Sequence, residues 1–304
     1  MERSIYPFSI FDPWQSSLCT CPKKYSLNPY TGCSFGCLYC YAKGYIGKRE
    51  STPKKDYVKL LERSARKLNR ALPVNIGTSS DPYPDIEQKF KLTRASLSIL
   101  INMNFKVLIT TKGGELLLRD ADLMKKGKVA VTPTVTTLNE DLAKKLEPMA
   151  PSPKERIRVM EEMNKNDIPL GARVDPIIPG LNDDEKELKE LVNALAEAGA
   201  RLIITSTYKA RFVDFKDMIN VFPDMREKWK RLYFEEGERI GGYMYLSKSL
   251  RERLLKLVVD EAKKLGLEYA TCREGLTSPE YFKARSCDGT HLTEMGKRSG
   301  SEQK

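Results

Sequence analysis

The stretch that organises this chain is Cys33-Ser34-Phe35-Gly36-Cys37-Leu38-Tyr39-Cys40. Its three thiols lie close enough in sequence to close on one metal centre, but their spacing fits neither a zinc hairpin nor a heme attachment site, and no fourth ligand is nearby. Soft thiolates select iron-sulfur clusters, zinc or Cu(I), and a cluster with one iron free of protein ligands can bind a cofactor there. The stretch therefore predicts an open metal cluster, with a structural zinc or redox thiol site as the alternative.

The composition favours a globular cytoplasmic protein. The chain has 304 residues, 40% of them hydrophobic and 31% charged, enough to bury the core of one barrel-sized domain. No run approaches the roughly 20 apolar residues of a membrane span, and the first residues have no signal-peptide core. In a reducing compartment, seven cysteines are more naturally metal ligands than disulfides. Frequent Lys and Glu with only three Gln favour a thermophilic source.

The net charge of +11 is not evenly spread along the chain. Between residues 43 and 72, ten Lys or Arg stand against three acids. Apolar residues at every third or fourth position predict a helix in this segment, with Lys59, Arg63, Arg66 and Arg70 on its polar face. A nucleic acid is the partner that such a face would bind, and a solvated surface in a Lys-rich protein is the alternative.

Short apolar strands alternate with amphipathic helices from residue 25 onward. This alternation predicts a parallel α/β sheet. The expected fold is a partial (βα)6 TIM-type barrel over residues 25–207, with an irregular N-terminal arm over 1–24 and a C-terminal α+β extension over 208–304 packed on the barrel. Strands are expected at 25–30, 74–78, 106–111, 129–135, 171–178 and 202–207, with a last strand at 268–272.

Polar residues follow each predicted strand, where the chemistry of parallel barrels gathers. The strand ends and the segments that follow them supply hydroxyls, one Lys, carboxylates and guanidinium groups, which are expected to line the mouth of the barrel. They include Ser80, Glu87, Arg94, Lys112, Arg119, Asp120, Thr134, Glu147, Arg156, Arg173 and Asp175. For any single Thr, filling of the strand by a β-branched side chain is the simpler interpretation.

The order of these motifs resembles that of radical S-adenosylmethionine (SAM) enzymes, and within them the spore photoproduct lyase-like, or DNA repair photolyase-like, family. Besides the Cys-rich stretch, the resemblance rests on Asn28-Pro29-Tyr30-Thr31-Gly32, Asp81-Pro82-Tyr83 and Asp175-Pro176-Ile177-Ile178-Pro179-Gly180. It is clear from about Tyr25 to Asn182 and weaker from there to the C-terminus.

The resemblance implies a cofactor set. Cys33, Cys37 and Cys40 would hold a [4Fe-4S] cluster, and SAM would chelate its unique iron and be cleaved reductively to a 5′-deoxyadenosyl radical. An electron donor such as ferredoxin or flavodoxin would supply the electron. The cofactor-binding residues that it implies are Tyr39 near the adenine and, as further contacts of SAM, Ser80, Lys112 and Thr134.

One position departs from the family pattern. Spore photoproduct lyase has a hydrogen-donating Cys two residues before the residue that matches Ser80, and Thr78 stands there in this chain. A hydroxyl is a poor donor of hydrogen atoms. The resemblance therefore implies SAM cleavage more firmly than it implies thymine-dimer repair, and the catalytic residues stay unknown.

Four cysteines and one histidine lie outside these motifs. Cys19, Cys21, Cys272 and Cys287 are enough for a second Fe-S or zinc site with four thiolates. A hydrogen donor at Cys272 or Cys287, and inert buried thiols, are the other interpretations. The single histidine, His291, excludes metal sites built on two histidines.

Three functions are consistent with these features. The first is a radical SAM enzyme that acts on a nucleic acid or nucleotide. The second keeps the radical chemistry but acts on a protein or a small metabolite. The third is a zinc-containing nucleic-acid-binding protein without catalysis.

Overall fold

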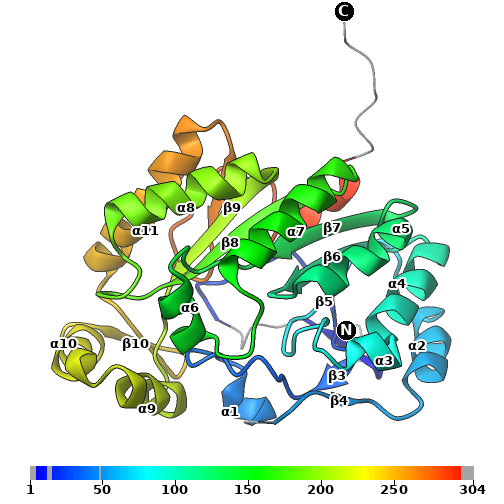
Figure 1. Ribbon diagram of the computed structural model, residues 1–304, viewed down its shortest axis with the longest axis horizontal. Helices are drawn as coiled ribbons and strands as arrows, with labels where there is room; N and C mark the ends of the chain where they lie inside the picture. The colour runs from blue at the N-terminus through cyan, green and yellow to red at the C-terminus, as the bar shows by residue number, and fades with distance from the viewer. Residues whose placement is uncertain (1–4, 12–15, 48, 296–304) are drawn as a thin grey trace, which may run out of the picture.

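A single eight-stranded sheet forms the centre of the molecule (Figure 1). The computed structural model describes residues 5–11, 16–47 and 49–295. Six strands run parallel in the order in which they occur along the chain, as the predicted partial barrel requires. They are β2 (Tyr25–Leu27), β5 (Val74–Ile76), β6 (Lys106–Thr111), β7 (Lys128–Pro133), β8 (Leu170–Ile177) and β9 (Ala200–Thr207).

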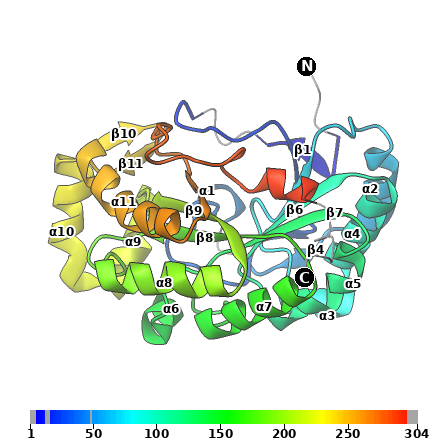
Figure 2. The same cartoon turned by 90° about the horizontal axis from the view of Figure 1, so that it is seen from above.

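Helices cover the convex side of this sheet (Figures 1 and 2). Two of these helices begin with typical N-terminal capping residues. Ser152 caps the helix that begins with Pro153, and Asp184 caps the helix that begins with Glu185 by accepting a hydrogen bond from the Glu187 amide. The principal helices are α2 (Tyr57–Ala65), α4 (Leu92–Asn102), α5 (Ala121–Met124), α6 (Glu140–Leu146), α7 (Pro153–Lys165), α8 (Glu185–Glu197) and α11 (Lys248–Lys264).

One further strand joins each edge of the sheet. β1 (Phe8–Ile10) pairs antiparallel with β2, so the arm predicted as irregular contains a strand, too short to show an alternating pattern. At the other edge, β12 (Glu268–Thr271) pairs in parallel with β9. The sheet thus continues across residues 24 and 207, where the boundaries of the barrel with the N-terminal arm and the C-terminal extension were predicted. The predicted fold class, a partial barrel with extensions, is confirmed.

The segment after β12 fills the concave side of the sheet (Figure 2). Successive strand side chains point to opposite sides, so Val107 and Ile109 pack under the helices while Leu108 points inward. Leu108 meets Leu292 and Cys287 there, in a small second core. The segment Thr290–Glu294 therefore lies on the side of the sheet opposite α7 and α8 (Figure 2).

Smaller elements surround the open end of the barrel. They are β3 (Tyr30–Thr31), α1 (Lys43–Ile46), β4 (Thr52–Pro53), α3 (Glu87–Phe90), α9 (Phe212–Val221), α10 (Arg226–Lys230), β10 (Glu238–Ile240) and β11 (Tyr243–Tyr245). Among the described residues, no helix is long and apolar enough to cross a membrane.

A buried carboxylate joins the first half of the barrel. Glu87 is fully buried and accepts hydrogen bonds from the Tyr30 hydroxyl, from the backbone of Thr93 (2.9 Å) and from the Arg119 guanidinium (2.5 Å). Arg119 also pairs with Asp120. A buried charge is tolerated only where it is paired and hydrogen-bonded in this way.

We expect Glu87→Ala to destabilise the fold strongly, because it leaves four donors without this acceptor, the fourth being the Arg94 amide (3.2 Å). Loss of one partner of a buried pair costs about 3 kcal/mol or more. Glu62→Ala removes an exposed pair with Arg66 and should cost less than about 1 kcal/mol. Urea unfolding of both variants measures this difference, and equal losses would refute it.

Candidate functional site

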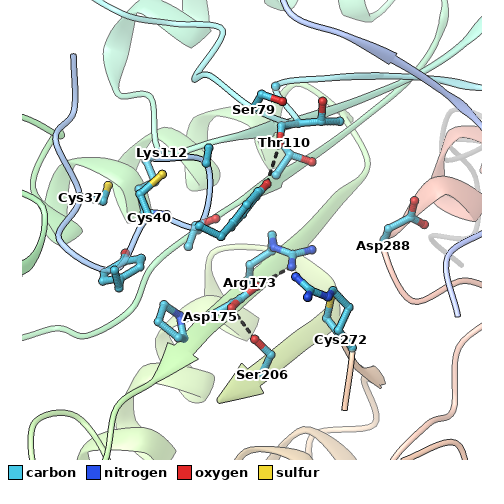
Figure 3. A pocket seen from close by; sticks show the side chains of 18 of the residues that line it. Cys37, Cys40, Ser79, Thr110, Lys112, Arg173, Asp175, Ser206, Cys272 and Asp288 are labelled. Carbon is cyan, nitrogen blue, oxygen red and sulfur yellow. Dashed lines mark hydrogen bonds and ion pairs between the residues drawn. The ribbon is translucent and has the colours of Figure 1, made fainter. Parts of the chain in front are cut away.

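A cavity of about 240 Å³ opens at the carboxyl ends of the parallel strands. Residues at the ends of β5, β6, β7, β8 and β9 line it, as do the Cys-rich loop and the C-terminal extension (Figure 3). This is the end of the barrel at which catalytic residues are expected. The predicted cluster ligands and cofactor contacts all line this cavity, namely Cys33, Cys37, Tyr39, Cys40, Ser80, Lys112 and Thr134.

Backbone contacts fix the loop that carries the three thiols. The Cys33 amide donates to the Arg49 carbonyl (2.9 Å), and the Leu38 amide donates to the carbonyl of Leu146 at the end of α6 (2.8 Å). Gly32 has a φ of +79°, and a Cβ atom there would lie 2.3 Å from the Glu50 carbonyl oxygen. Only glycine allows the chain to pass this close to the segment 49–51.

The three thiols are suited to a cluster. None of the seven cysteines forms a disulfide. Burial raises the pKa of Cys33 to about 11 and that of Cys37 well above its usual value, so a positively charged centre is needed to hold both as thiolates. Within the described ranges, no three Cys, His, Asp or Glu side chains are placed to hold a single metal ion. A cubane cluster takes one thiolate per iron, so three thiols along one wall of a cavity fit it.

A buried ion pair supports the loop from below. Glu147 and Arg156 are both about 1% exposed and form a salt bridge. Glu147 also accepts from the Tyr39 hydroxyl and from the Thr136 hydroxyl (2.9 Å). The Lys112 ammonium lies 5.5 Å from the centre of the Tyr39 ring. Burial alone would raise the pKa of Glu147, but Arg156 and Lys112 hold it below its ordinary value.

The loop after β5 places the next hydroxyls. Asn28 accepts from the backbone amides of Ser79 (2.9 Å) and Ser80 (3.3 Å) through its side-chain oxygen. The Ser80 hydroxyl donates to the Tyr30 carbonyl (3.0 Å). The Thr78 hydroxyl is bonded to Ser26 and accepts from Asn28 (3.1 Å). Thr78 thus has a structural role in holding the loop in place.

Asp81 couples this loop to β6. It is half-buried, and it accepts from the Thr111 hydroxyl (2.7 Å) and the Lys112 amide (2.6 Å). Burial raises the pKa of its carboxyl, and the hydrogen bonds oppose that rise. The position of Lys112 in the cavity therefore depends on Asp81.

A second charged group comes from β8. Arg173 forms a salt bridge with Asp175 (2.5 Å), which also accepts from the Ser206 hydroxyl at the end of β9 (2.5 Å) (Figure 3). Burial would raise the pKa of Asp175, but Arg173 lowers it. These residues were predicted to line the mouth and do so. In contrast, Glu87, Arg94, Arg119, Asp120, Glu147 and Arg156 do not line the cavity, because they pair with one another beneath it.

The C-terminal extension adds residues that the sequence motifs did not indicate. Lys209 binds Glu274 (2.7 Å), which is buried and accepts from the Thr207 amide as well (2.7 Å). At the edge of the cavity, the guanidinium groups of Arg211 and Arg273 lie over the Tyr243 ring, 4.9 and 4.7 Å from its centre. The family resemblance is weaker in this part of the sequence and assigns no role to these residues.

The four remaining cysteines gather near the same cavity. Cys19, Cys21 and Cys272 line it, and the Cys287 sulfur lies 3.4 Å from that of Cys21. Hydrogen bonds from the thiols of Cys19 and Cys287, aided by the nearby Lys24 ammonium, hold the pKa of Cys21 well below its usual value. His291 is bonded to Ser286 (2.6 Å) and Glu268 (2.5 Å) and does not line the cavity.

Known proteins are similar to this chain in sequence and in fold. A model of the radical SAM superfamily matches residues 27–195, more than half of the chain. An uncharacterized protein of Methanocaldococcus jannaschii is 33% identical over 175 residues, which cover 53% of this chain and 63% of that protein, so the chain spans less than two thirds of this relative. A protein of Pseudomonas phage M6 named radical SAM Nα-GlyT isomerase is 22% identical over 257 residues, covering 81% of this chain and 53% of the relative.

Two solved structures extend the likeness to the fold. A spore photoproduct lyase variant with bound AdoMet and dinucleoside spore photoproduct aligns with a TM-score of 0.66 at 17% identity, over 90% of this chain and 81% of that chain. Streptococcus suis SuiB bound to S-adenosylmethionine aligns with a TM-score of 0.54 at 17% identity, over 84% and 52%. The family match takes in the Cys-rich loop and the whole of β5, β6, β7 and β8, with most of α8. The chain therefore belongs to the radical SAM superfamily, and it is an enzyme.

Proposed function

We propose that the enzyme binds a [4Fe-4S] cluster through Cys33, Cys37 and Cys40 and cleaves SAM bound beside it. The observation that carries this proposal is that the three loop thiols share one cavity with Ser80, Lys112 and Thr134. When bound, such a cluster would supply the electron that breaks SAM into methionine and a 5′-deoxyadenosyl radical. Because the chain belongs to a family of enzymes, we no longer consider the third function, a nucleic-acid-binding protein without catalysis.

The residues of the chain would bind and orient SAM. The Lys112 ammonium interacts electrostatically with the Cys37 thiol, and it can pair with the carboxylate of SAM. The hydroxyls of Ser80 and Thr134 can bond its amino group or its ribose. Tyr39 presents its ring to the cavity while its own hydroxyl is held by Glu147. Ion pairs on the walls fix these groups before the cofactor arrives, so little reorganisation is needed.

The substrate class that we propose is a nucleic acid or nucleotide. A guanidinium group can bind a phosphate bidentately, so Arg211 and Arg273, held over the buried Tyr243 ring, suit a nucleotide at the cavity edge. The structural neighbour crystallised with a dinucleoside photoproduct supports the same class. The four basic residues predicted to bind a nucleic acid are all exposed: Lys59 and Arg63 on α2, and Arg66 and Arg70 just after it. α2 lies on the outer wall of the barrel, however, and none of the four lines the cavity (Figure 1).

SAM cleavage by the loop can be tested directly. Protein reconstituted anaerobically with iron and sulfide should form 5′-deoxyadenosine when dithionite and SAM are added, as measured by liquid chromatography with mass spectrometry. We expect the Cys33→Ala/Cys37→Ala/Cys40→Ala variant to lose at least 100-fold of this activity. Lack of product from wild-type protein with a full cluster would refute the proposal.

The geometry of the loop predicts a distinct effect of Gly32→Ala. The new methyl group would collide with the Glu50 carbonyl and displace the loop, so we expect a folded protein that binds less than about half of the wild-type iron. Gly241→Ala is the matched control, since Gly241 also has a positive φ but its Cβ would meet nothing within 4 Å. Iron content and circular dichroism measure the two effects, and equal iron in both variants would contradict the prediction.

Salt-dependent binding tests the nucleic-acid partner. We expect replacement of Lys59, Arg63, Arg66 and Arg70 by Gln to weaken binding of a DNA oligonucleotide at least tenfold and to flatten its salt dependence, because each phosphate contact releases a counterion. A control variant carries the same change at the exposed Lys186, Lys248, Lys263 and Lys264. If both variants and the wild type bind alike, α2 is a solvated surface, and a protein or small metabolite becomes the better substrate class.

A further inference from the structure

All four cysteines outside the cluster loop meet at one place, although the sequence separates them widely. Cys19 and Cys21 belong to the N-terminal arm, Cys272 directly follows β12, and Cys287 lies in the segment that fills the concave side of the sheet. The Cys21 amide also donates to the Cys19 sulfur (3.4 Å). In Figure 3, Cys272 lies across the cavity from Cys37 and Cys40, with Arg173 between them. The cavity thus has two groups of thiols on different walls.

The spacing of the central pair is informative. The sulfurs of Cys21 and Cys287 are 3.4 Å apart, too far for the disulfide length of about 2.05 Å. A tetrahedral ion with metal-sulfur bonds of about 2.3 Å places its sulfurs about 3.8 Å apart. Cys21 and Cys287 therefore stand close to the separation of two ligands of one ion.

The surroundings are those of a binding site more than of an inert core. One side of the group packs on the apolar cluster of Leu202, Ala270 and Leu292. The other side is the cavity, and buried cations adjoin it there. The Lys24 ammonium is 1% exposed and interacts with both Cys21 and Cys287, while Arg173 interacts with Cys272. Cations in these positions would offset the negative charge of several thiolates, which apolar packing alone could not.

We propose that Cys19, Cys21, Cys272 and Cys287 bind a second metal centre, held by thiolates alone, across the cavity from the Cys33 loop. Four thiolates complete the ligand set of a zinc ion or of an iron-sulfur cluster, and the separation of the central pair favours a single ion. No three described side chains are placed to hold one ion without movement, so binding requires Cys19 and Cys272 to turn about their single side-chain bond toward the central pair. The centre would fasten both ends of the chain over the cavity.

The test uses a background that lacks the first cluster, so that its result does not depend on the proposed SAM chemistry. We expect the Cys33→Ala/Cys37→Ala/Cys40→Ala variant, purified anaerobically, to retain about one equivalent of zinc, or iron with acid-labile sulfide. Adding Cys21→Ser/Cys287→Ser should remove that metal. Elemental and sulfide analyses identify the centre as a zinc ion or an iron-sulfur cluster. Background metal in the first variant would overturn the proposal.

A second measurement guards against loss of metal through misfolding. Leu292→Ala, in the same background, opens the neighbouring core without removing a thiol, and it should keep the metal. In the otherwise native chain, alkylation followed by mass spectrometry should find these four cysteines protected until a chelator is added. Equal alkylation with and without the chelator, or a Cys21–Cys287 disulfide in freshly isolated protein, would contradict a metal centre.

Discussion

The salt bridge between Glu147 and Arg156 is the interaction on which the position of the cluster loop depends. Both groups are almost fully buried, and removing either would leave the other charge uncompensated in the interior. Glu147 also accepts hydrogen bonds from Tyr39 and Thr136, and so connects the loop to the segment that follows strand β7. Arg156 donates in turn to the Thr134 carbonyl (2.9 Å), next to a predicted SAM contact. One pair of charges therefore sets the relative positions of the loop and the strand end.

Much of this architecture could be predicted because it depends on local periodicity. The helix predicted between residues 43 and 72 is observed as α2, and the predicted strand at 106–111 is observed with the same ends. Ser80, Lys112 and Thr134 reach one cavity because parallel strands that follow one another in sequence end at the same edge of the sheet. Strand order alone was enough to bring those three residues together.

The direction of polar side chains could not be predicted in the same way. Arg119 follows a predicted strand and Arg173 lies on one, yet Arg173 lines the cavity while Arg119 does not and pairs with Glu87 instead. A residue pattern shows that a charge is near a strand end, but the partner that compensates it comes from another element. Contacts between distant parts of the chain were still harder to predict from the sequence, since Cys21 and Cys287 are 266 positions apart. Their meeting depends on glycines, for a Cβ on Gly289 would lie 2.9 Å from the Thr132 methyl carbon.

The charges of the cavity place limits on what can enter it. Most of its buried cations already have a carboxylate partner: Lys24 has Asp288, Arg173 has Asp175, and Lys209 has Glu274. The negative charge of thiolates at the loop would thus be balanced by Lys112 and by the ligand that binds in the cavity. This requirement favours metal ions and the cationic sulfonium of SAM over a polyanion. The phosphates of a nucleotide would be better placed at the edge, near Arg211 and Arg273, with only the base or sugar reaching inward. The same balance of charge that suits the cavity to a cluster would keep a nucleic-acid backbone outside it.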